Sequence, residues 1–451
     1  MTLRITVLGT GYVGTAHAVT MAGAGFSVLG MDIDAEKIAA LTSGRVPLFE
    51  PGIEDLVNHH RLRGVLQFTT SYREAARFGD VHFLCVPTPQ SPDGSADLKP
   101  LLGALEGLAP HLTRPALVVG KSTVPVGTAT VLGERLAELA GHPAVELAWN
   151  PEFLREGHAV VDSLHPDRLV FGVSSAPAAA LLREVYRFLL DQGVPLIVTG
   201  LETAELIKMA ANAFLATKIS FINAVAEMCE LVSADVVTVA EALGQDPRIG
   251  SAHLHPGLGF GGSCLPKDLR SFTAQARALR LTGAASLLTA VDQINDQARN
   301  RLVDLVRAEC GGTLRGKRIA ALGAAFKPDS DDTRDSPALA VAEQLHREGA
   351  HVAVFDPRAS AQARRACPQL DHGESLLHVC READLLVHLT DWPQFRDVDP
   401  AAVAEVVRAR RIVDARNSLD PQKWRAAGWR FTALGRPASD PTISLSGTLL
   451  R

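Results

Sequence analysis

Short apolar runs alternate with amphipathic stretches over the first 200 residues of the chain. The apolar runs predict strands at residues 4–9, 26–32, 81–87, 115–122 and 145–150. Residues 13–24 and 34–43 have the spacing of helices that separate such strands. Short buried strands with helices between them are typical of a parallel sheet covered on both faces. The pattern therefore predicts a doubly wound α/β domain that ends near residues 194–200.

The periodicity changes at residue 201. Residues 201–232 contain no Gly or Pro. Apolar residues recur there at helical spacing, including Leu206, Met209, Ala213, Phe214 and Ala216. We predict one helix, longer than is usual in a globular protein. Such a helix bridges domains or packs against a second subunit, which favours a homodimer or a larger assembly.

Further helices are expected to about residue 310, interrupted by a glycine-rich loop at 255–268, and strand–helix alternation resumes at 317. The expected fold class is α/β, with two Rossmann-like doubly wound domains joined by a central helical domain. The expected boundaries are 1–200, 201–310 and 311–451. Ligands of such sheets bind at the carboxyl ends of the strands. The tail at 436–451 carries no strong pattern and is expected to be disordered.

Composition excludes several classes of protein. Apolar residues make up 47% and charged residues 21%, so the chain is not of the disordered type. Lys and Arg number 45 against 50 Asp and Glu, which argues against nucleic-acid binding because no basic excess is available for phosphates. The six cysteines are scattered without metal-ligand spacing, so no metal site is expected. The N-terminus does not resemble a signal peptide and no apolar run is expected to span a membrane, so we expect a cytoplasmic protein.

Gly9, Gly11 and Gly14 form GTGYVG directly after a predicted strand and at the start of a helix. Bare backbone there lets a pyrophosphate approach the positive end of the helix. Asp32 ends the second strand, where its carboxylate would accept both hydroxyls of a ribose. Because this carboxylate repels a 2′-phosphate and no Arg immediately follows, NAD is favoured over NADP. Lys37 is either a secondary contact of the site or a solvated helix residue.

Three hydroxyl residues lie where further strands end. Thr88 follows the strand at 81–87, and Ser122 and Thr123 follow the strand that ends near residue 121. The carboxyl edge of the sheet is where the nicotinamide half of a dinucleotide is expected. Hydroxyls next to turns also act as helix caps, so each residue taken alone has that second interpretation.

A thiol, a lysine and carboxylates form the second chemical signal. Cys264 lies in the glycine-dense loop, before a helix that Pro266 can start, where helix N-terminal amides favour a thiolate. Cys229 and Cys310 are better explained as buried, inert cysteines. A dehydrogenase with a nucleophilic thiol can trap an aldehyde and carry it on to an acid through a thioester. Other polar residues expected near this thiol are Lys267, Asp268, Glu152, Glu156, Lys208 and Asn212.

The motifs together resemble those of the nucleotide-sugar dehydrogenase family, from Ile5 to about Ser418. The matching strings are GTGYVG, EPG, CVPTP, STVPVGT, NPEFLREG, ETAELIKMAANAFLATKISFIN, DPRIG, GLGFGGSCLPKD, AFKPDSDDTRDSP and DARN. The resemblance implies a four-electron oxidation of UDP-glucose to UDP-glucuronate with two NAD, at a thiol nucleophile. It also implies that the first domain binds NAD, the central domain forms a dimer and the last domain binds the UDP sugar.

The resemblance implies roles for individual residues. The catalytic residues would be Cys264 as nucleophile, Lys208 and Asp268 for the proton of the alcohol, Glu152 for water activation, and Asn212 and Thr123 to hold that water and the sugar. The cofactor would contact Gly9, Gly11, Tyr12, Val13, Gly14, Asp32, Lys37, Thr88, Thr123, Glu156, Lys267 and Arg334. The substrate would contact Glu152, Phe153, Leu154, Arg155, Lys208, Asn212, Arg248 from the neighbouring subunit, Gly257, Gly259, Phe260, Gly261, Lys327 and Arg416.

Two residues depart from the family pattern. Leu265 follows the nucleophile where a Phe is expected, and Met209 follows the lysine where an aromatic residue is common. Both changes leave open the same chemistry on GDP-mannose or UDP-N-acetylmannosamine. A non-catalytic nucleotide-sugar sensor is disfavoured because Cys264, Lys208 and Asp268 are all present. A two-electron hydroxyacid dehydrogenase would not explain the thiol loop.

Overall fold

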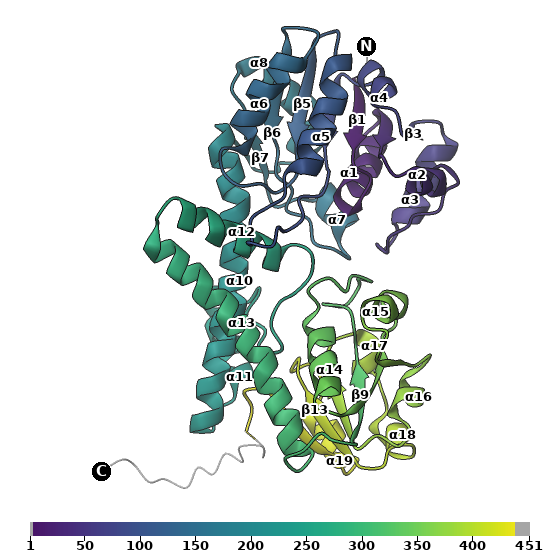
Figure 1. Cartoon of the computed structure of the whole chain (residues 1–451), viewed down its shortest axis with the longest axis vertical. Coiled ribbons are helices and arrows are strands. Elements are labelled where there is room, and N and C mark those ends of the chain that lie inside the picture. Colours follow the sequence, from purple (N-terminus) through teal and green to yellow (C-terminus); the bar gives the residue numbers. More distant parts are fainter. Residues whose placement is uncertain (1–2, 438–451) are drawn as a thin grey trace. The chain divides into compact units, whose positions relative to one another are not determined.

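The computed structural model describes residues 3–437, so most of the patternless tail lies outside the described residues. The chain folds as two compact units. Unit 1 comprises Met1–Ala213 and Lys267–Ala285, and unit 2 comprises Phe214–Pro266 and Ser286–Arg451. The chain passes from one unit to the other within helices, which explains why no linker is evident in the sequence. Each unit contains one sheet (Figure 1).

Unit 1 is built on an eight-stranded sheet. Its strands in spatial order are β3 (Leu66–Thr69), β2 (Ser27–Met31), β1 (Arg4–Leu8), β4 (Val81–Leu84), β5 (Ala116–Gly120), β6 (Val145–Trp149), β7 (Leu169–Gly172) and β8 (Leu196–Thr199). All neighbours are parallel except β6 and β7, where Trp149 lies antiparallel to Gly172. The prediction of an all-parallel sheet is wrong at this pair. Residues 150–168, which include the short helix α7 (Ala159–Leu164), connect β6 to β7 and bring β7 alongside β6 in the opposite direction.

Alternating residues of each strand point into two separate cores. In β5, Leu117 and Val119 face one core, and Ala116 and Val118 face the other. The first core is covered by α1 (Tyr12–Gly23), α3 (Ile53–Leu62), α7 and α8 (Ala176–Val185). The second is covered by α4 (Tyr72–Phe78), α5 (Lys99–Leu108), the 3₁₀ turn η1 (Ala109–His111) and α6 (Thr128–Leu139). The remaining short helices of this unit are α2 (Ala35–Thr42) and α9 (Arg187–Leu190).

The long central helix is confirmed. Helix α10 spans Leu201–Val232, a length of 32 residues, and the other helices before the last sheet are α11 (Val236–Gln245), α12 (Leu265–Ala278) and α13 (Thr282–Glu309). Of the apolar residues that indicated this helix, Met209, Ala213 and Ala216 are buried. Leu206 and Phe214 are exposed, so they do not belong to the buried stripe.

Helix α10 is also long and apolar enough, by length and composition, to cross a membrane, and 44% of its most apolar window is buried in the protein. Its buried polar side chains bond to other segments. Glu205 accepts from the backbone N–H of Gly127, and the Ser220 hydroxyl donates to the carbonyl of Val291. Because its buried polar groups bond to other segments of the chain, we interpret α10 as a core helix, a kind of helix that meets the same length and hydropathy test.

Unit 2 contains a six-stranded sheet in which every pair is parallel. Its order is β11 (Asp371–His372), β10 (His351–Phe355), β9 (Arg318–Leu322), β12 (Leu385–His388), β13 (Arg411–Asp414) and β14 (Arg430–Ala433). Helices on both faces are α14 (Pro337–Arg347), α15 (Ser360–Ala366), α16 (Leu376–Cys380), α17 (Pro393–Arg396), α18 (Pro400–Ala404) and α19 (Pro421–Ala426). Two doubly wound α/β sheets and one long helix confirm the predicted fold class. The boundaries at residues 200 and 310 stay a prediction.

Candidate active site

The glycines after β1 have three separable physical roles. Gly9 has φ +89°, and a Cβ there would lie 2.8 Å from the carbonyl oxygen of Cys85. A Cβ on Gly14 would lie 1.8 Å from the carbonyl oxygen of Gly9. No atom lies within 4 Å of a Cβ built on Gly11, which immediately precedes α1. The fold therefore requires Gly9 and Gly14, whereas Gly11 leaves space at the helix N-terminus, as a bound pyrophosphate requires.

Asp32 lies directly after β2 with its carboxylate mostly buried. It accepts hydrogen bonds from the backbone N–H of Thr10 at 2.9 Å and of Asp34 at 3.1 Å, and it pairs with the Lys37 ammonium at 2.9 Å. Burial alone would raise the pKa of Asp32, but Lys37 and the backbone donors outweigh it and lower that pKa. The carboxylate is therefore held charged, as NAD selectivity requires. Lys37 acts on this site through Asp32 rather than as a solvated helix residue.

The NPEFLREG segment after β6 is anchored to the start of α1. The carboxylate of Glu50 accepts from the backbone N–H of Gly157 and of Ala159, both at 2.7 Å. The Tyr12 hydroxyl also accepts from the Gly157 N–H. Arg155 makes a two-point ion pair with Asp162. The predicted cofactor residue Tyr12 and the segment holding Phe153, Leu154 and Glu156 are thus fixed together.

A buried polar cluster in unit 1 brings predicted catalytic residues together. The Lys208 ammonium lies 2.9 Å from the Glu152 carboxylate, and both side chains are buried. One turn further along α10, the Asn212 amide donates to the Asp268 carboxylate at 2.7 Å. The ion pair therefore joins α10 to the segment after β6, and the amide hydrogen bond joins α10 to the first turn of α12.

Lys267 extends this cluster to the ends of β4 and β5. Its ammonium lies 2.6 Å from the Asp268 carboxylate and 3.3 Å from the Thr88 hydroxyl. The Thr88 hydroxyl donates to the backbone carbonyl of Thr123 at 2.8 Å. The strand-end hydroxyls are therefore connected to the cluster instead of acting only as helix caps. Ser122, the third of them, donates to the carbonyl of Val86.

Cys264 immediately precedes α12, and Asp268 lies in the first turn of that helix. Cys264 is the exposed cysteine, whereas the other five are buried; all six lie among the described residues and are thiols. Burial raises the pKa of Cys85 and of Cys380 to about 12, which makes both poor nucleophiles. Exposure at a helix start thus distinguishes Cys264 from the other five cysteines, and its role as the nucleophile stays a prediction. Within residues 3–437, no three His, Cys, Asp or Glu side chains gather as a metal site.

The glycine-rich loop before Cys264 packs closely against other segments of unit 2. A Cβ on Gly259 would lie 2.3 Å from the Asn295 side-chain oxygen, and one on Gly261 would lie 2.3 Å from the carbonyl oxygen of Asp335. A Cβ on Gly257 would lie 2.7 Å from the carbonyl oxygen of Ala415. The glycines predicted to contact substrate are therefore also required by the packing of the loop. Phe260, between them, is buried.

Arg416 braces the same loop. Its half-buried guanidinium donates to the carbonyls of Gly259 at 3.0 Å, Phe326 at 3.2 Å and Leu389 at 2.7 Å. Burial lowers the pKa of Arg416, although Asp391 and Asp414 oppose this effect. Three N–H groups of the predicted substrate-binding arginine are thus bonded to the protein itself.

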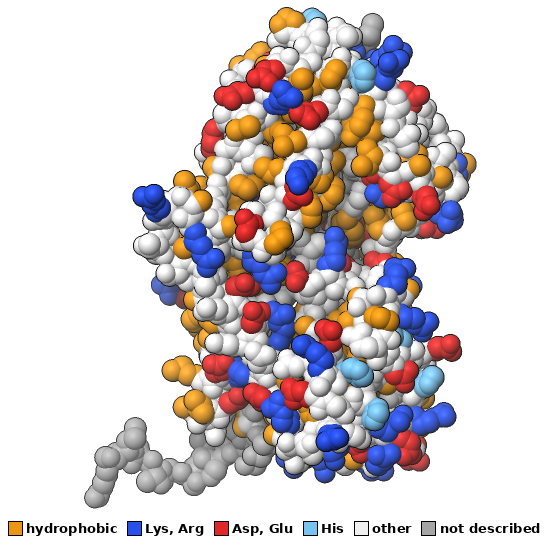
Figure 2. Space-filling model, viewed as in Figure 1, with side chains coloured by type: hydrophobic (Ala, Val, Ile, Leu, Met, Phe, Trp, Pro, Cys, Tyr) orange, Lys and Arg blue, Asp and Glu red, His pale blue; other side chains and the backbone are white. Residues whose placement is uncertain are grey.

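Three other predicted basic residues of unit 2 lie near its surface. Arg248 makes a two-point ion pair with Asp246, Arg334 makes one with Asp332, and both arginines are exposed. The Lys327 ammonium lies over the ring of Phe326. On the face shown in Figure 2, basic and acidic side chains are interspersed.

Asp356 occupies in unit 2 the place that Asp32 has in unit 1, directly after the second strand of the sheet. Its carboxylate accepts from the backbone N–H groups of Ala324, Ala325, Arg358 and Ala359 and from the Trp392 indole. Its hydrogen-bonding capacity is used by the protein. Asp32 accepts four donors, three of them on one oxygen, so its other oxygen has a single partner, whereas both oxygens of Asp356 have at least two.

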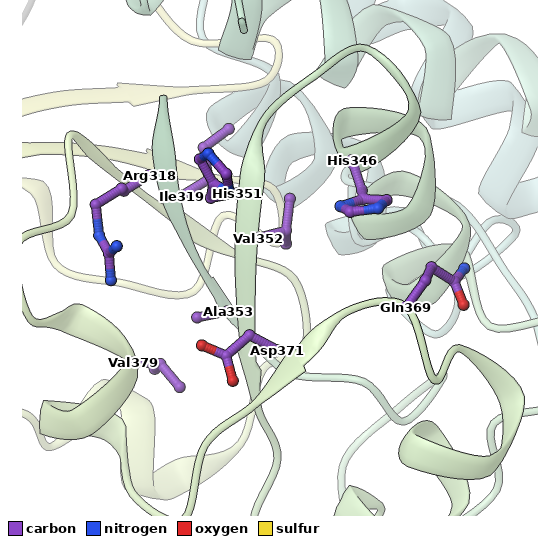
Figure 3. Close-up of a pocket in the computed structure, with 9 residues that line it drawn as sticks. All are labelled: Arg318, Ile319, His346, His351, Val352, Ala353, Gln369, Asp371 and Val379. Atoms are coloured by element: carbon purple, nitrogen blue, oxygen red, sulfur yellow. The ribbon is translucent and has the colours of Figure 1, made fainter. Parts of the chain in front are cut away.

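A pocket of unit 2 lies at the amino ends of its strands, opposite the edge that carries Arg416. It has an empty volume of about 540 Å³ and is lined by residues at the starts of β9 and β10, among them Arg318 and His351. Figure 3 shows His346 and Gln369 on one side of β10 and Arg318 on the other, so these side chains do not converge on a common point. We assign no part of the predicted site to this pocket.

The structure also shows polar residues that the sequence reasoning missed. Lys121 and Asn150 are buried at the ends of β5 and β6, and Glu205 is buried one turn before Lys208. Their signal was present, because Asn150 and Glu205 lie within recognised strings and Lys121 directly precedes one. Glu50 lies in the recognised string EPG, yet its capping of the NPEFLREG segment was not predicted.

Comparison with known proteins identifies the class. Residues 3–190 match the NAD binding domain of the UDP-glucose/GDP-mannose dehydrogenase family, residues 202–297 its central domain and residues 320–421 its UDP binding domain. The chain belongs to this family of dehydrogenases. The predicted family, the enzyme class and NAD as cofactor are confirmed.

Individual relatives match over nearly the whole chain. The UDP-glucose 6-dehydrogenase YwqF of Bacillus subtilis is 39% identical over 442 residues, covering 98% of this chain and 99% of that protein. The UDP-glucose 6-dehydrogenase of Rhizobium meliloti is 41% identical over 438 residues, covering 96% of this chain and 100% of that protein. The solved structure of a UDP-glucose dehydrogenase from the archaeon Pyrobaculum islandicum has a TM-score of 0.89 at 36% identity, covering 97% of this chain and 98% of that one.

Proposed function

We propose that this protein oxidises UDP-glucose to UDP-glucuronate in two successive two-electron steps, the second of them on a covalent adduct with Cys264. The observation that carries the proposal is the buried cluster in which Lys208 contacts Glu152 and Asn212 contacts Asp268. A two-electron alcohol dehydrogenase needs a proton acceptor but no nucleophilic thiol. Here Asp268 lies in the first turn of α12, and an exposed cysteine immediately precedes that helix. The names of the full-length relatives support the choice of sugar.

NAD supplies the hydride acceptor, and two molecules are used in turn. The residues that fit it are Gly11 at the open helix start and Asp32 with its charged carboxylate. Thr88, Thr123 and Lys267 extend the contact along the carboxyl edge of the sheet. We propose the same function for the other cofactor residues named from the sequence.

The chain's own groups manage protons and the acyl intermediate. Lys208 and Asp268, through a water molecule, take the proton of the C6 hydroxyl as the alcohol becomes an aldehyde. The Cys264 thiolate then adds to the aldehyde carbon and gives a thiohemiacetal, whose oxyanion Lys208 stabilises. The second oxidation converts the thiohemiacetal to a thioester. Glu152 removes a proton from water, the hydroxide adds to the thioester carbon, and the C–S bond breaks to return the Cys264 thiolate and the free acid.

The glycine-rich loop and the sheet of unit 2 would hold the nucleotide. Arg416 fixes the backbone of Gly259, and Lys327 supplies a cation for the diphosphate. Phe153, Leu154 and Arg155 would line the sugar. We also propose a homodimer in which Arg248 acts in the neighbouring site, and a cytoplasmic location, which the six reduced thiols favour.

The decisive test is the yield of NADH from limiting UDP-glucose with excess NAD, with the product identified by mass. We expect two NADH per sugar and UDP-glucuronate. Cys264→Ser should still bind both ligands but should release less than one hundredth of the wild-type acid. One NADH per sugar would contradict the nucleophilic role of Cys264. If no NADH formed, the test would be repeated with GDP-mannose and UDP-N-acetylmannosamine.

A further inference from the structure

Lys121 is a buried lysine that the proposed reaction does not use. It directly follows β5, and its side chain is only 6% exposed. The ammonium donates to the side-chain oxygen of Asn150 at 2.8 Å and to the hydroxyl of Tyr186 at 3.3 Å. The Tyr186 hydroxyl donates to the same Asn150 oxygen at 2.5 Å. Lys121, Asn150 and Tyr186 thus form one buried cross-link, which we call the lysine clasp.

The lysine clasp joins the ends of two neighbouring strands. The backbone N–H of Lys121 bonds to Leu84 of β4, and that of Asn150 bonds to Gly120 of β5, so both residues continue the sheet. The Asn150 amide also donates to the carbonyl of Val170 in β7. Because these bonds hold each residue from several sides, the clasp has little freedom to shift.

Two predicted catalytic residues lie close to the clasp along the chain. Thr123 comes two residues after Lys121, and Glu152 comes two residues after Asn150. Both are assigned to the water that hydrolyses the thioester. A small change in the separation of the two strand ends would move both groups relative to that water, and misplacement by about 1 Å can cost about a hundredfold in rate.

Joining two strands through a buried ammonium carries a large desolvation cost. Its direct partners, the Asn150 oxygens and the Tyr186 hydroxyl, are all neutral, and the rings of Phe83 and Tyr186 flank it at 5.8 Å. An apolar residue would fill such a core position without the desolvation cost of a charge. The charge therefore calls for an explanation beyond packing, and Glu152 is the carboxylate that interacts with it electrostatically.

We propose that Lys121 is a positioning residue for thioester hydrolysis, holding Thr123 and Glu152 in register through the lysine clasp. The proposal rests on the proposed function, because it assigns Lys121 to the hydrolytic half of that reaction. It predicts that loss of Lys121 slows hydrolysis much more than it slows either oxidation.

Burial lowers the pKa of Lys121 to about 8, against opposing effects of Cys85 and Glu152. Lys121 is therefore charged below about pH 8 and neutral above it. The titratable groups that interact with it from the surrounding elements are His17, Cys85, Glu152, Tyr186 and Lys208. Burial places the pKa of His17 well below its usual value and that of Tyr186 well above, so neither changes charge near pH 8. The hydrolysis rate should decline as the pH rises through about 8.

The test is a rapid-mixing experiment on Lys121→Met with UDP-glucose and excess NAD. We expect a burst of two NADH per site at a rate within about threefold of the wild type, followed by hydrolysis slowed at least tenfold. Acid quenching during the slow phase should yield protein with an acyl adduct on Cys264, detected by mass. The decline of hydrolysis above pH 8 should be absent from this variant.

Three further variants make the outcome decisive. Lys99→Met makes the same substitution at an exposed lysine and should behave as the wild type. Tyr186→Phe keeps the ring but removes one contact of the clasp, and it should slow hydrolysis about threefold even if Lys121→Met does not fold. Glu152→Gln should accumulate the same adduct.

A normal hydrolysis rate in Lys121→Met, or a smaller burst without an adduct, would overturn the proposal for Lys121 alone, provided that Glu152→Gln traps the adduct. Absence of the adduct from both variants would overturn the proposed function as well.

Discussion

At the residue scale, buried charges of unit 1 are held by neutral backbone donors as well as by counter-ions. Glu205 accepts the backbone N–H groups of Gly127 and Ala129 at 2.7 and 2.6 Å, and so connects α10 to the start of α6. Lys208 follows one turn later on α10, and Thr123 lies just before the loop that Glu205 holds. Glu205, which has no direct part in the proposed chemistry, therefore helps to position Lys208 and Thr123.

Glu205 gives a prediction for stability against pH. Burial raises its pKa to about 7, although the two N–H donors oppose the shift. The folded protein therefore binds this proton more tightly than the unfolded chain, and stability falls as the pH rises from about 4.5 to about 7, by at most about 3 kcal/mol. Glu205→Gln should lose this part of the pH dependence in denaturant titrations. An unchanged profile would show that Glu205 titrates normally in the folded protein.

At the element scale, the β1–α1 turn separates binding from folding in one motif. Gly11→Ala meets no neighbouring atom, so the free enzyme should unfold at the wild-type temperature, but its NAD dissociation constant should rise at least tenfold because the methyl group occupies the open space. Gly14→Ala meets the carbonyl of Gly9 and should lower stability by about 1–3 kcal/mol. Calorimetric titration with NAD and thermal unfolding without it provide the two measurements. Equal loss of stability in both variants would contradict this division of roles.

The sequence predicted what depends on local order along the chain. The glycine motif, Asp32 and the 32-residue helix are each defined within one segment, so their residue types were sufficient evidence. The lysine clasp depends on which strands become neighbours, and Tyr186 lies 65 residues from Lys121. The antiparallel β6–β7 pair likewise depends on the path of the connecting segment, which the hydrophobic periodicity of the sequence does not predict. The exposure of Leu206 and Phe214 was missed because helical spacing shows apolar positions but not which of them are covered.

At the scale of the whole molecule, α10 carries an apolar stripe that one copy of the chain leaves exposed. Phe214, Phe221 and Met228 recur every seven residues, and their exposed fractions are 65%, 54% and 67%. Seven residues make two helical turns, so the three side chains lie along one side of the helix. Such a surface supports the proposed homodimer.

Phe221→Asp should weaken this dimer at least tenfold, because a carboxylate would be desolvated in the contact. Sedimentation at several concentrations measures the change. Leu62→Asp introduces the same charge at an exposed position of α3 and should leave the assembly unaltered. A monomeric wild type would contradict the proposed interface.

A shared site predicts complementation between inactive subunits. Arg248→Ala and Cys264→Ser should each be nearly inactive, and co-expression should restore about a quarter of the wild-type sites, since half of randomly formed dimers are hybrids with one intact site each. Activity of the purified mixture measures this recovery. Failure to recover would place Arg248 outside the neighbouring subunit's chemistry.

The hydrogen bonds that Asp356 already accepts affect which ligand can bind to the second sheet. A ribose hydroxyl could bond to this carboxylate only by displacing donors that are already bonded to it, and each such hydrogen bond contributes about 1 kcal/mol. The second sheet is similar in strand order to the first, but its carboxylate is a weaker acceptor site for the ribose of a dinucleotide. We therefore expect that a high concentration of NAD does not exclude the sugar nucleotide from the second half of the enzyme.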